Sequence, residues 1–176
     1  MSYFNIVAQS SESTVVTEYT PKGKRSDGYQ SEAQLEQEFI RMLQDLGYGY
    51  LQIHKEADLI ANLREQLSKV NGCEFTDVEW DRFFKEVLAN PNADIAEKTR
   101  LIQEDHVQVL KRDNGESKNI VLIDKKNIHN NVLQVINQYT VSTDDGAKHD
   151  NRYDVTILVN GLPLVHIELK RRGVPI

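Results

Sequence analysis

Three charged residues lie within or at the ends of apolar, strand-like segments close to the C-terminal end of the sequence. The stretch YDVTILVNGLPLVHIELKRRG, residues 153–173, reads as two strands joined by a turn, and it carries Asp154, Glu168 and Lys170. Moving a charged group out of water costs several kcal/mol unless a partner or a metal ion compensates it. The pattern therefore predicts that something compensates these three charges.

An acidic residue two positions before a lysine is a common pattern, so its context decides its meaning. Glu116 and Lys118 lie in the polar turn RDNGESKN, where charges are solvated. Asp124 and Lys126 follow NIVLI, and the favoured interpretation is that they lie at the exposed end of a strand. In LPLVHIELK the pair belongs to an apolar run, and alternation along a strand points Glu168 and Lys170 to one face. The three pairs are Glu116 with Lys118, Asp124 with Lys126, and Glu168 with Lys170.

The register of the hairpin decides whether Asp154 can meet Glu168. A two-residue Asn-Gly turn pairs Val159 with Leu162, and a regular ladder then leaves Asp154 on the face opposite Glu168. A three-residue loop would pair Asp154 with Glu168, and a β-bulge would do the same. Because a shared site requires this pairing, we predict one of these two irregularities.

Two carboxylates at that separation repel each other unless a cation lies between them. Carboxylate oxygens suit Mg²⁺ or Mn²⁺, and metal-assisted phosphodiester cleavage requires such a cation together with a nearby ammonium group. Asp154 and Glu168 fit the role of metal ligands, and Lys170 fits the role of the ammonium. The alternative is a structural salt bridge between Glu168 and Lys170. His166 shares the face of Glu168 by alternation, and filling the sheet is the favoured interpretation of it.

Composition and charge limit the classes of protein that are compatible with this chain. Its 176 residues, 39% hydrophobic and 27% charged, suit one globular domain with a hydrophobic core. The net charge of −6 argues against a protein that coats nucleic acid through general attraction. A local basic patch remains at Lys170, Arg171 and Arg172, where the two arginines either contact a DNA backbone or end a strand in solvent.

The compartment is expected to be the reducing cytoplasm. Cys73 is the only cysteine, so neither an internal disulfide nor a cysteine-rich zinc site can form. No apolar run reaches the roughly 18 residues of a membrane span, and the first residues lack a secretory pattern. No Gly-rich P-loop motif for nucleotide phosphates occurs.

Hydrophobic periodicity predicts a helical half followed by strands. Residues 1–30 form an arm with two short β-prone runs and a polar loop, and residues 31–176 form the main domain. Helices are expected at 31–46, at 56–70, from 76 to the NPN breaker at 90–92, and at 94–104. From residue 107 onward the pattern predicts a sheet of four or five strands. The sequence thus indicates a mixed α/β (α+β) domain.

Three of these helices have a defined apolar stripe in the sequence, which in the second helix consists of Leu59, Ile60, Leu63, Leu67 and Val70. The first, capped by Ser31 with Gln34, is expected to bury Leu35, Phe39, Met42, Leu43 and Leu46. The third is expected to bury an apolar and aromatic set in the core, in preference to using it as a base-stacking platform: Val78, Trp80, Phe83, Phe84, Val87 and Leu88.

Several segments together resemble a known family. The hairpin NRYDVTILVNGLPLVHIELKRRG, with YQSEAQLEQEFIRMLQDLGY, NLREQL and LIDKKN, resembles the N-terminal part of the restriction (R) subunit of type I restriction-modification enzymes, especially the type IC group. The resemblance runs from about Tyr29 to the last residue. It implies a restriction-endonuclease-like domain of the PD-(D/E)xK type, with a central mixed sheet flanked by helices.

The resemblance also implies site residues, cofactors and partners. The hairpin motif falls on Asp154, Glu168 and Lys170, with Mg²⁺ as the metal, Mn²⁺ as a substitute, and the Leu169 carbonyl as a further ligand. A helix glutamate often completes such a site. Glu36 is the best match and Glu32 the alternative, while an exposed helix charge is the simpler account of Glu36.

The implied activity is cleavage of double-stranded DNA by a complex with methyltransferase and specificity subunits. In the family, ATP serves motor domains that follow this region and would not bind to these 176 residues. Two features depart from the family pattern. Tyr153 stands where the motif's proline would be, and the helix with a Q-x-x-x-Y element that follows the lysine strand is not present before Ile176. The expected domain is therefore truncated at its C-terminal end.

Overall fold

A four-stranded sheet with a helix on each face is the centre of the computed structural model, which describes residues 3–9, 14–19, 31–141 and 151–170. Its strands are β3 (Gly49–Tyr50), β6 (Leu133–Val141), β7 (Asn151–Val159) and β8 (Leu162–Ile167), in this spatial order. β3 pairs parallel with β6, whereas β6, β7 and β8 form an antiparallel meander. The predicted mixed α/β fold class is confirmed.

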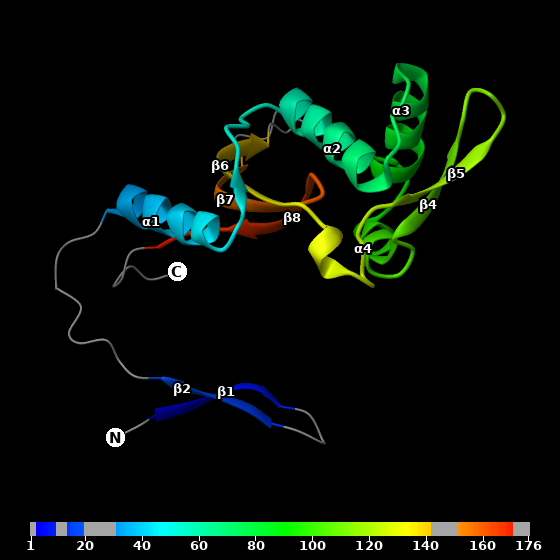
Figure 1. Ribbon diagram of the computed structural model, residues 1–176. Coiled ribbons are helices and arrows are strands. Elements are labelled where there is room, and N and C mark those ends of the chain that lie inside the picture. The colour runs from blue at the N-terminus through cyan, green and yellow to red at the C-terminus, as the bar shows by residue number, and fades with distance from the viewer. Residues whose placement is uncertain (1–2, 10–13, 20–30, 142–150, 171–176) are drawn as a thin grey trace. The chain divides into compact units, whose positions relative to one another are not determined.

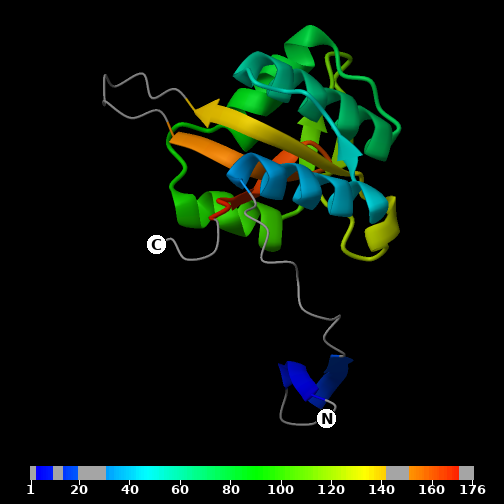
Figure 2. The same cartoon turned by 90° about the vertical axis from the view of Figure 1, so that its left-hand side faces the viewer.

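Helices α1 (Glu32–Asp45) and α2 (Glu56–Asn71) cover opposite faces of this sheet (Figure 1 and Figure 2). On one face, Ile40 and Leu43 of α1 pack against Val135 and Val155. On the other face, Leu59 of α2 belongs to a cluster of buried side chains from the sheet and the preceding loop: Ile53, Ile136, Tyr139 and Leu158. The central strands β6 and β7 are therefore covered on both faces, whereas residues 163–166 of β8 are exposed.

The first helix begins as the sequence predicts but is rotated relative to the expected stripe. Ser31 and Gln34 form the predicted capping box. The residues that α1 buries are Glu36, Ile40 and Leu43, while Met42 and Leu46 are exposed. The expected burial of Met42 and Leu46 was wrong, because the sheet contacts the face of the helix that carries Glu36.

A second group of elements packs against α2 and the start of β8. It contains α3 (Asp77–Phe83), the π-helical turn η1 (Phe84–Leu88), α4 (Ile95–Gln103), and the hairpin of β4 (Val107–Lys111) and β5 (Ser117–Val121). Leu63 and Leu67 of α2 meet Trp80, Phe83 and a set of strand and loop residues in one core: Cys73, Phe75, Leu110, Ile120, Leu122 and Leu162. The aromatic helix thus serves the core, except for Val78, which is 63% exposed.

The single sheet of four or five strands expected from residue 107 onward was wrong in one respect. In the described part of the chain, β4 and β5 pair with each other and lie outside the sheet of β3, β6, β7 and β8. Their buried side chains Leu110 and Ile120 face the aromatic core around α3. That core separates the small hairpin from the central sheet.

The chain divides into two compact units at residue 30, and the smaller unit is residues 1–30. Its described strands are β1 (Tyr3–Gln9) and β2 (Thr14–Tyr19), which form an antiparallel ladder with an irregularity between Ile6 and Ala8. Both strands occur where β-prone runs are present in the sequence.

The turn between β7 and β8 is fixed from two sides. Asn160 and Gly161 both have positive φ, 52° and 83°, which is the conformation of a two-residue hairpin turn of the I′ type. The buried Asn160 accepts a hydrogen bond from the Val132 N–H at 2.8 Å and donates to the Leu122 carbonyl at 2.9 Å and to Asn131 Oδ1 at 2.8 Å. This network also ties the turn to η2 (Ile128–Asn130), a short 3-10 helix, because Asn131 directly follows it.

Gly161 is expected to be essential for this turn. A Cβ at Gly161 would lie 2.6 Å from Leu63 Cα and 3.1 Å from Leu63 N, so Gly161→Ala adds a backbone clash to the strain of a positive φ. We expect it to lower the free energy of unfolding by about 3 kcal/mol. Gly115→Ala is the matched control, since Gly115 has φ of 86° and no atom within 4 Å of the added Cβ. It should cost only about 1 kcal/mol. Urea denaturation of both variants measures the difference, and equal losses would contradict the packing argument.

Candidate active site

The hairpin register brings Asp154 to the level of Glu168. Val159 pairs with Leu162 across the two-residue turn, and Leu158 pairs with Pro163. The ladder then shifts, so that Ile157 pairs with Val165 and Val155 pairs with Ile167. Leu164 is therefore an extra residue in β8, which is the defining feature of a β-bulge. The predicted bulge is confirmed, and continuing the shifted register by one position places Asp154 opposite Glu168.

The half-buried Asp154 makes a direct contact with the segment that carries Glu168 and Lys170. Its Oδ2 accepts a hydrogen bond from the Leu169 N–H at 2.8 Å. Leu169 is itself half-buried and packs with Ile167 against the α1-side core. Glu168 and Lys170, on either side of it, are exposed. This is the alternation that the sequence predicts around Leu169.

Lys170 stands in a negative environment. Its Nζ forms an ion pair with Glu168 Oε1. This hydrogen bond and the charge of Glu168 raise the pKa of Lys170, and the charges of Glu32 and Asp154 raise it further. A raised pKa keeps the side chain as an ammonium ion at neutral pH. In this arrangement the Lys170 side chain carries a positive charge.

Glu36 is buried and held by two amides of strand β6. It is 9% exposed, and its Oε1 accepts from Asn137 Nδ2 at 2.6 Å, while its other oxygen accepts from Gln138 Nε2. Asn137 Oδ1 in turn accepts from the Tyr50 hydroxyl at 2.8 Å. The expectation of an exposed helix charge was therefore wrong for Glu36. The alternative residue, Glu32, is exposed, and its charge acts on Lys170.

Four carboxylates come from three parts of the chain near these contacts. Glu32 and Glu36 lie on α1, Asp154 lies on β7, and Glu168 follows β8. On β6, Gln138 binds Glu36. Its two neighbours pair with Val155 and Tyr153, the residues on either side of Asp154. Gln138 therefore lies across from Asp154 in the order β6-β7-β8.

Asp154, Glu168 and the Leu169 carbonyl could together supply oxygen ligands to a divalent cation. Within the described ranges, no group of three or more His, Cys, Asp and Glu side chains is arranged to hold a metal. The expected set has two carboxylates and a main-chain carbonyl, so its donor chemistry still fits Mg²⁺ or Mn²⁺. Glu168 already has a cationic partner in Lys170, so a metal ion would compete with that ammonium for the same oxygen.

His166 has its own partners beside the site. Its Nδ1 lies 3.0 Å from Thr156 Oγ1, and its ring stacks on Tyr153 with centroids 4.0 Å apart. Desolvation lowers the pKa of His166, so the ring is neutral at pH 7. His166 is exposed, so its ring covers Tyr153 at the surface of the sheet and does not fill a buried position.

The other acidic-lysine pairs have structural roles or solvent exposure. Asp124 Oδ1 accepts from the N–H groups of Lys126 and Asn127, and its Oδ2 accepts from Asn130 Nδ2. The bonds from Asn127 and Asn130 are the main reasons that its pKa is lowered. Glu116 lies in the exposed β4–β5 turn, where its Oε2 accepts from Asn114. Arg171 and Arg172 lie outside the described residues.

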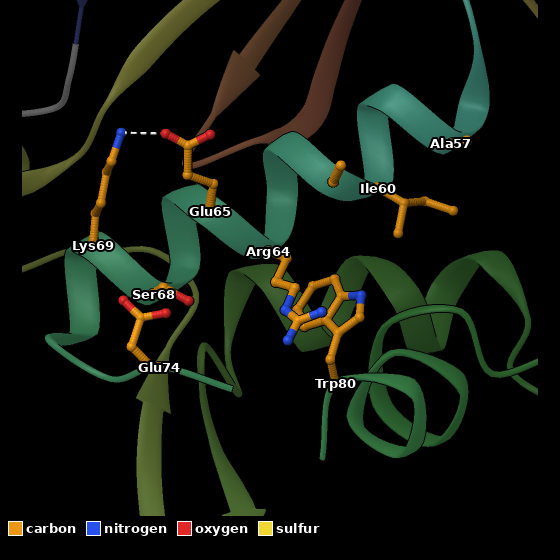
Figure 3. Close-up of a pocket in the computed structure, with 9 residues that line it drawn as sticks. Ala57, Ile60, Arg64, Glu65, Ser68, Lys69, Glu74 and Trp80 are labelled. Atoms are coloured by element: carbon orange, nitrogen blue, oxygen red, sulfur yellow. Dashed lines mark hydrogen bonds and ion pairs between the residues drawn. The ribbon is translucent and has the colours of Figure 1, made fainter. Parts of the chain in front are cut away.

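A pocket between α2 and α3, with a volume of about 530 Å³, is also lined by charged side chains (Figure 3). Arg64 on its wall donates to Asp77 Oδ1 at 2.7 Å and to the Phe75 carbonyl, and Lys69 forms an ion pair with Glu65. None of the residues predicted for the site lines this pocket. Arg64 links α2 to Asp77 at the start of α3, whereas the Lys69–Glu65 ion pair lies within α2.

Comparison with known proteins identifies the family. Residues 29–176 match the family model described as the type I restriction enzyme R protein N terminus. The chain belongs to this family. It is 44% identical over 171 residues to the type I restriction enzyme EcoprrI endonuclease subunit of Escherichia coli. The aligned segment covers 97% of this chain and 53% of that protein. The resemblance stated from the sequence is confirmed.

Longer relatives of the R protein family show the same similarity. The SsaAORF53P endonuclease subunit of Staphylococcus saprophyticus is 40% identical over 153 residues, which is 84% of this chain and 16% of that protein. The SauMSSORF170P endonuclease subunit of Staphylococcus aureus is 39% identical over 153 residues, which is again 84% of this chain and 16% of that protein. The chain therefore spans about half of the first relative and a much smaller part of the other two.

Sequence reasoning missed the amides that surround the carboxylates. Asn137 and Gln138 interrupt the apolar strand VLQVINQYTV, as Glu168 interrupts the apolar run that continues from β8, and this interruption is the signal that could have indicated them. Arg152 was also missed, and its Nε donates to Gln138 Oε1. No helix in the described part of the chain is long and apolar enough to cross a membrane.

The ionisation of Lys170 is expected to follow Glu168. Replacing Glu168 with Ala removes both the hydrogen bond and the charge that contribute most, so the pKa of Lys170 should fall toward its ordinary value of 10.5. Titration of the lysine ¹³Cε resonance by NMR in the 176-residue chain measures this shift, with Lys170→Arg assigning the signal. Asp154→Asn should lower the same pKa by less, because Asp154 contributes less than Glu168. An unchanged pKa in Glu168→Ala would exclude the pairing.

Proposed function

We propose that this chain is the metal-dependent DNA endonuclease domain of a type I restriction R subunit, of the PD-(D/E)xK type. In this proposal the domain occupies residues 31–176 and continues beyond them, with residues 1–30 as a separate arm. The observation that supports it is the shifted hairpin register, in which Val155 pairs with Ile167, together with the hydrogen bond to Asp154 from the Leu169 N–H, between Glu168 and Lys170. Membership of the R protein family supports the reaction class.

Each residue has a stated role in this proposal. Asp154 and Glu168, with the Leu169 carbonyl, bind Mg²⁺, for which Mn²⁺ can substitute, and Glu36 holds the strand beside them. The bound ion lowers the pKa of the attacking water and polarises the phosphate. Lys170 stays an ammonium and stabilises the negative charge that develops on the scissile phosphate. Arg171 and Arg172 contact the DNA backbone.

The proposed setting is a larger complex in the cytoplasm. Methyltransferase and specificity subunits would supply sequence recognition, because base-reading side chains are not indicated in this chain. Motor domains in the complete subunit would use ATP to translocate double-stranded DNA before cleavage. The acidic charge of −6 fits a domain that does not hold DNA by itself.

A second candidate function is a non-catalytic docking domain that couples the motor to its partners. The observation in its favour is the Glu168–Lys170 ion pair, which compensates two charges without a metal ion. However, an exposed ion pair contributes only about 0–1 kcal/mol to stability. Both side chains are exposed, so their contribution to a scaffold is small. A purely structural role also does not explain the convergence of Asp154 on the same segment.

The test of the nuclease function uses the complete R subunit assembled with its partners. Glu168→Ala should reduce Mg²⁺-dependent cleavage of circular DNA by about 100-fold or more, because it removes a metal ligand and the partner of Lys170. ATP hydrolysis should be retained. Glu116→Ala is the matched control, since Glu116 also precedes a lysine by two positions but lies in the exposed β4–β5 turn.

Two outcomes of this experiment separate the candidate functions. Loss of cleavage in Glu168→Ala, with cleavage in Glu116→Ala and ATP hydrolysis in both variants unchanged, supports chemistry at this hairpin. Cleavage by Glu168→Ala at the rate of the unmodified complex would overturn the nuclease proposal for this site. The docking function would then be the better account.

A further inference from the structure

We infer that Gln138 is a positioning residue that sets the conformation of strands β6 and β7 at Asp154, and so the direction of the Asp154 carboxylate in the proposed metal site. This inference rests on the proposed function and deepens it. Gln138 touches neither Asp154 nor Glu168 through a described hydrogen bond. Its effect is on the conformation of the two central strands at the level of the site.

The backbone of Gln138 has an unusual conformation. Its φ is 54°, and in the described part of the chain the only other non-glycine residue with positive φ is Asn160. Asn160 has that conformation because it forms a two-residue hairpin turn, whereas Gln138 lies inside strand β6. A long side chain rarely adopts this region, and such residues cluster at functional sites.

The unusual conformation occurs at the residue opposite Asp154. The β6–β7 ladder pairs Asn137 with Val155 and Tyr139 with Tyr153, so Gln138 and Asp154 stand across from each other between these pairs. The strain is therefore located beside the carboxylate on which the proposed site depends.

In both strands, the alternation of side chains between the two sheet faces is interrupted at this point. Tyr153 and Val155 are two residues apart, so a regular strand would point them to one face. Instead, Tyr153 packs with the α2-side cluster and Val155 with the α1-side cluster. On β6, Asn137 bonds to Glu36 of α1, while Tyr139 belongs to the α2-side cluster. The interruption lies at Gln138 and Asp154.

The interruption determines where the Asp154 carboxylate goes. Thr156 and Leu158, which follow the interruption in β7, are fully buried, whereas Asp154 at the interruption is half-buried. Its carboxylate accepts the Leu169 N–H, between Glu168 and Lys170. The local conformation of the two strands therefore sets the direction of this carboxylate.

Side-chain bonds hold Gln138 in this conformation. Its Nε2 donates to the buried Glu36, and its Oε1 accepts from Arg152 Nε. The amide thus joins helix α1 to strand β7 two residues before Asp154. These bonds help to offset the backbone strain, so the side chain and the positive φ act together.

The test compares Mn²⁺ binding and DNA cleavage in the complete R subunit complex with two variants. Gln138→Val removes the amide and disfavours positive φ, whereas Gln138→Gly removes the amide but permits positive φ. We expect Val to weaken Mn²⁺ binding by about tenfold or more and Gly to weaken it by about threefold. Binding is measured without ATP from the electron paramagnetic resonance signal of free Mn²⁺. The Mn²⁺ concentration for half-maximal cleavage should rise by the same factors.

Gln108→Val is the matched control, since it makes the same change in strand β4, outside the central sheet. It should leave Mn²⁺ binding unchanged. A structural role alone would lower the melting temperature of the Gln138 variants without changing their affinity for Mn²⁺. If Gln138→Val fails to fold, Gln138→Gly decides the question, and unchanged binding in Gln138→Gly then overturns the inference.

Asp154→Ala separates this inference from the proposed function. If Asp154→Ala still cleaves DNA and binds Mn²⁺ normally, the proposed function fails and the inference fails with it. If Asp154→Ala loses both while the folded Gln138→Val retains normal Mn²⁺ binding, only the role of Gln138 is overturned. Loss in Asp154→Ala together with a graded loss in the Gln138 variants supports both.

Discussion

The bulge at Leu164 is the constraint on which the arrangement of the charged residues depends. The two-residue turn at Asn160 and Gly161 is held by buried hydrogen bonds and by close packing on Leu63, so the start of the ladder is fixed. A regular ladder from that turn would place Asp154 and Glu168 on opposite faces. One extra residue in β8 corrects the register, and it does so without changing the turn. The chain thereby keeps a tight hairpin and still aligns its two carboxylates.

Charge compensation at this end of the sheet is distributed among several elements. Lys170 neutralises Glu168, a main-chain N–H serves Asp154, and strand amides serve the buried Glu36. Each carboxylate therefore has a polar partner, which reduces the cost of removing it from water. The partners differ in mobility. The N–H of Leu169 is fixed by the backbone, whereas the exposed Lys170 can leave Glu168 when another cation approaches.

Much of the fold could be predicted from local patterns, and the failures have physical reasons. The capping box at Ser31 and apolar periodicity placed the helices, because these signals depend on neighbouring residues. The pattern could not tell that β4 and β5 leave the central sheet, since pairing between distant strands depends on the core around Trp80 and Phe83. The two-residue strand β3 is too short to give a periodic signal.

The site was predicted in part for similar reasons. The need to align Asp154 with Glu168 predicted an irregularity, but nothing in LPLVHI marks Leu164 as the extra residue. Glu36 was identified on the correct helix, yet its burial depends on a rotated helix face that the apolar stripe did not show. The positive φ of Gln138 had no sequence signal, because glutamine has no preference for that region.

The same irregular stretch of β8 also affects whether this edge of the sheet can pair with a strand of another molecule. β8 is the last strand in the order of the central sheet, and Leu164 and Val165 on it are 40% and 45% exposed. An apolar edge strand is a template for pairing with another chain and so promotes aggregation. Pro163 lacks an N–H, and the bulge beside it disrupts the spacing of backbone donors and acceptors. The interruption that aligns the carboxylates therefore also makes this edge a poor template for intermolecular β-sheet growth.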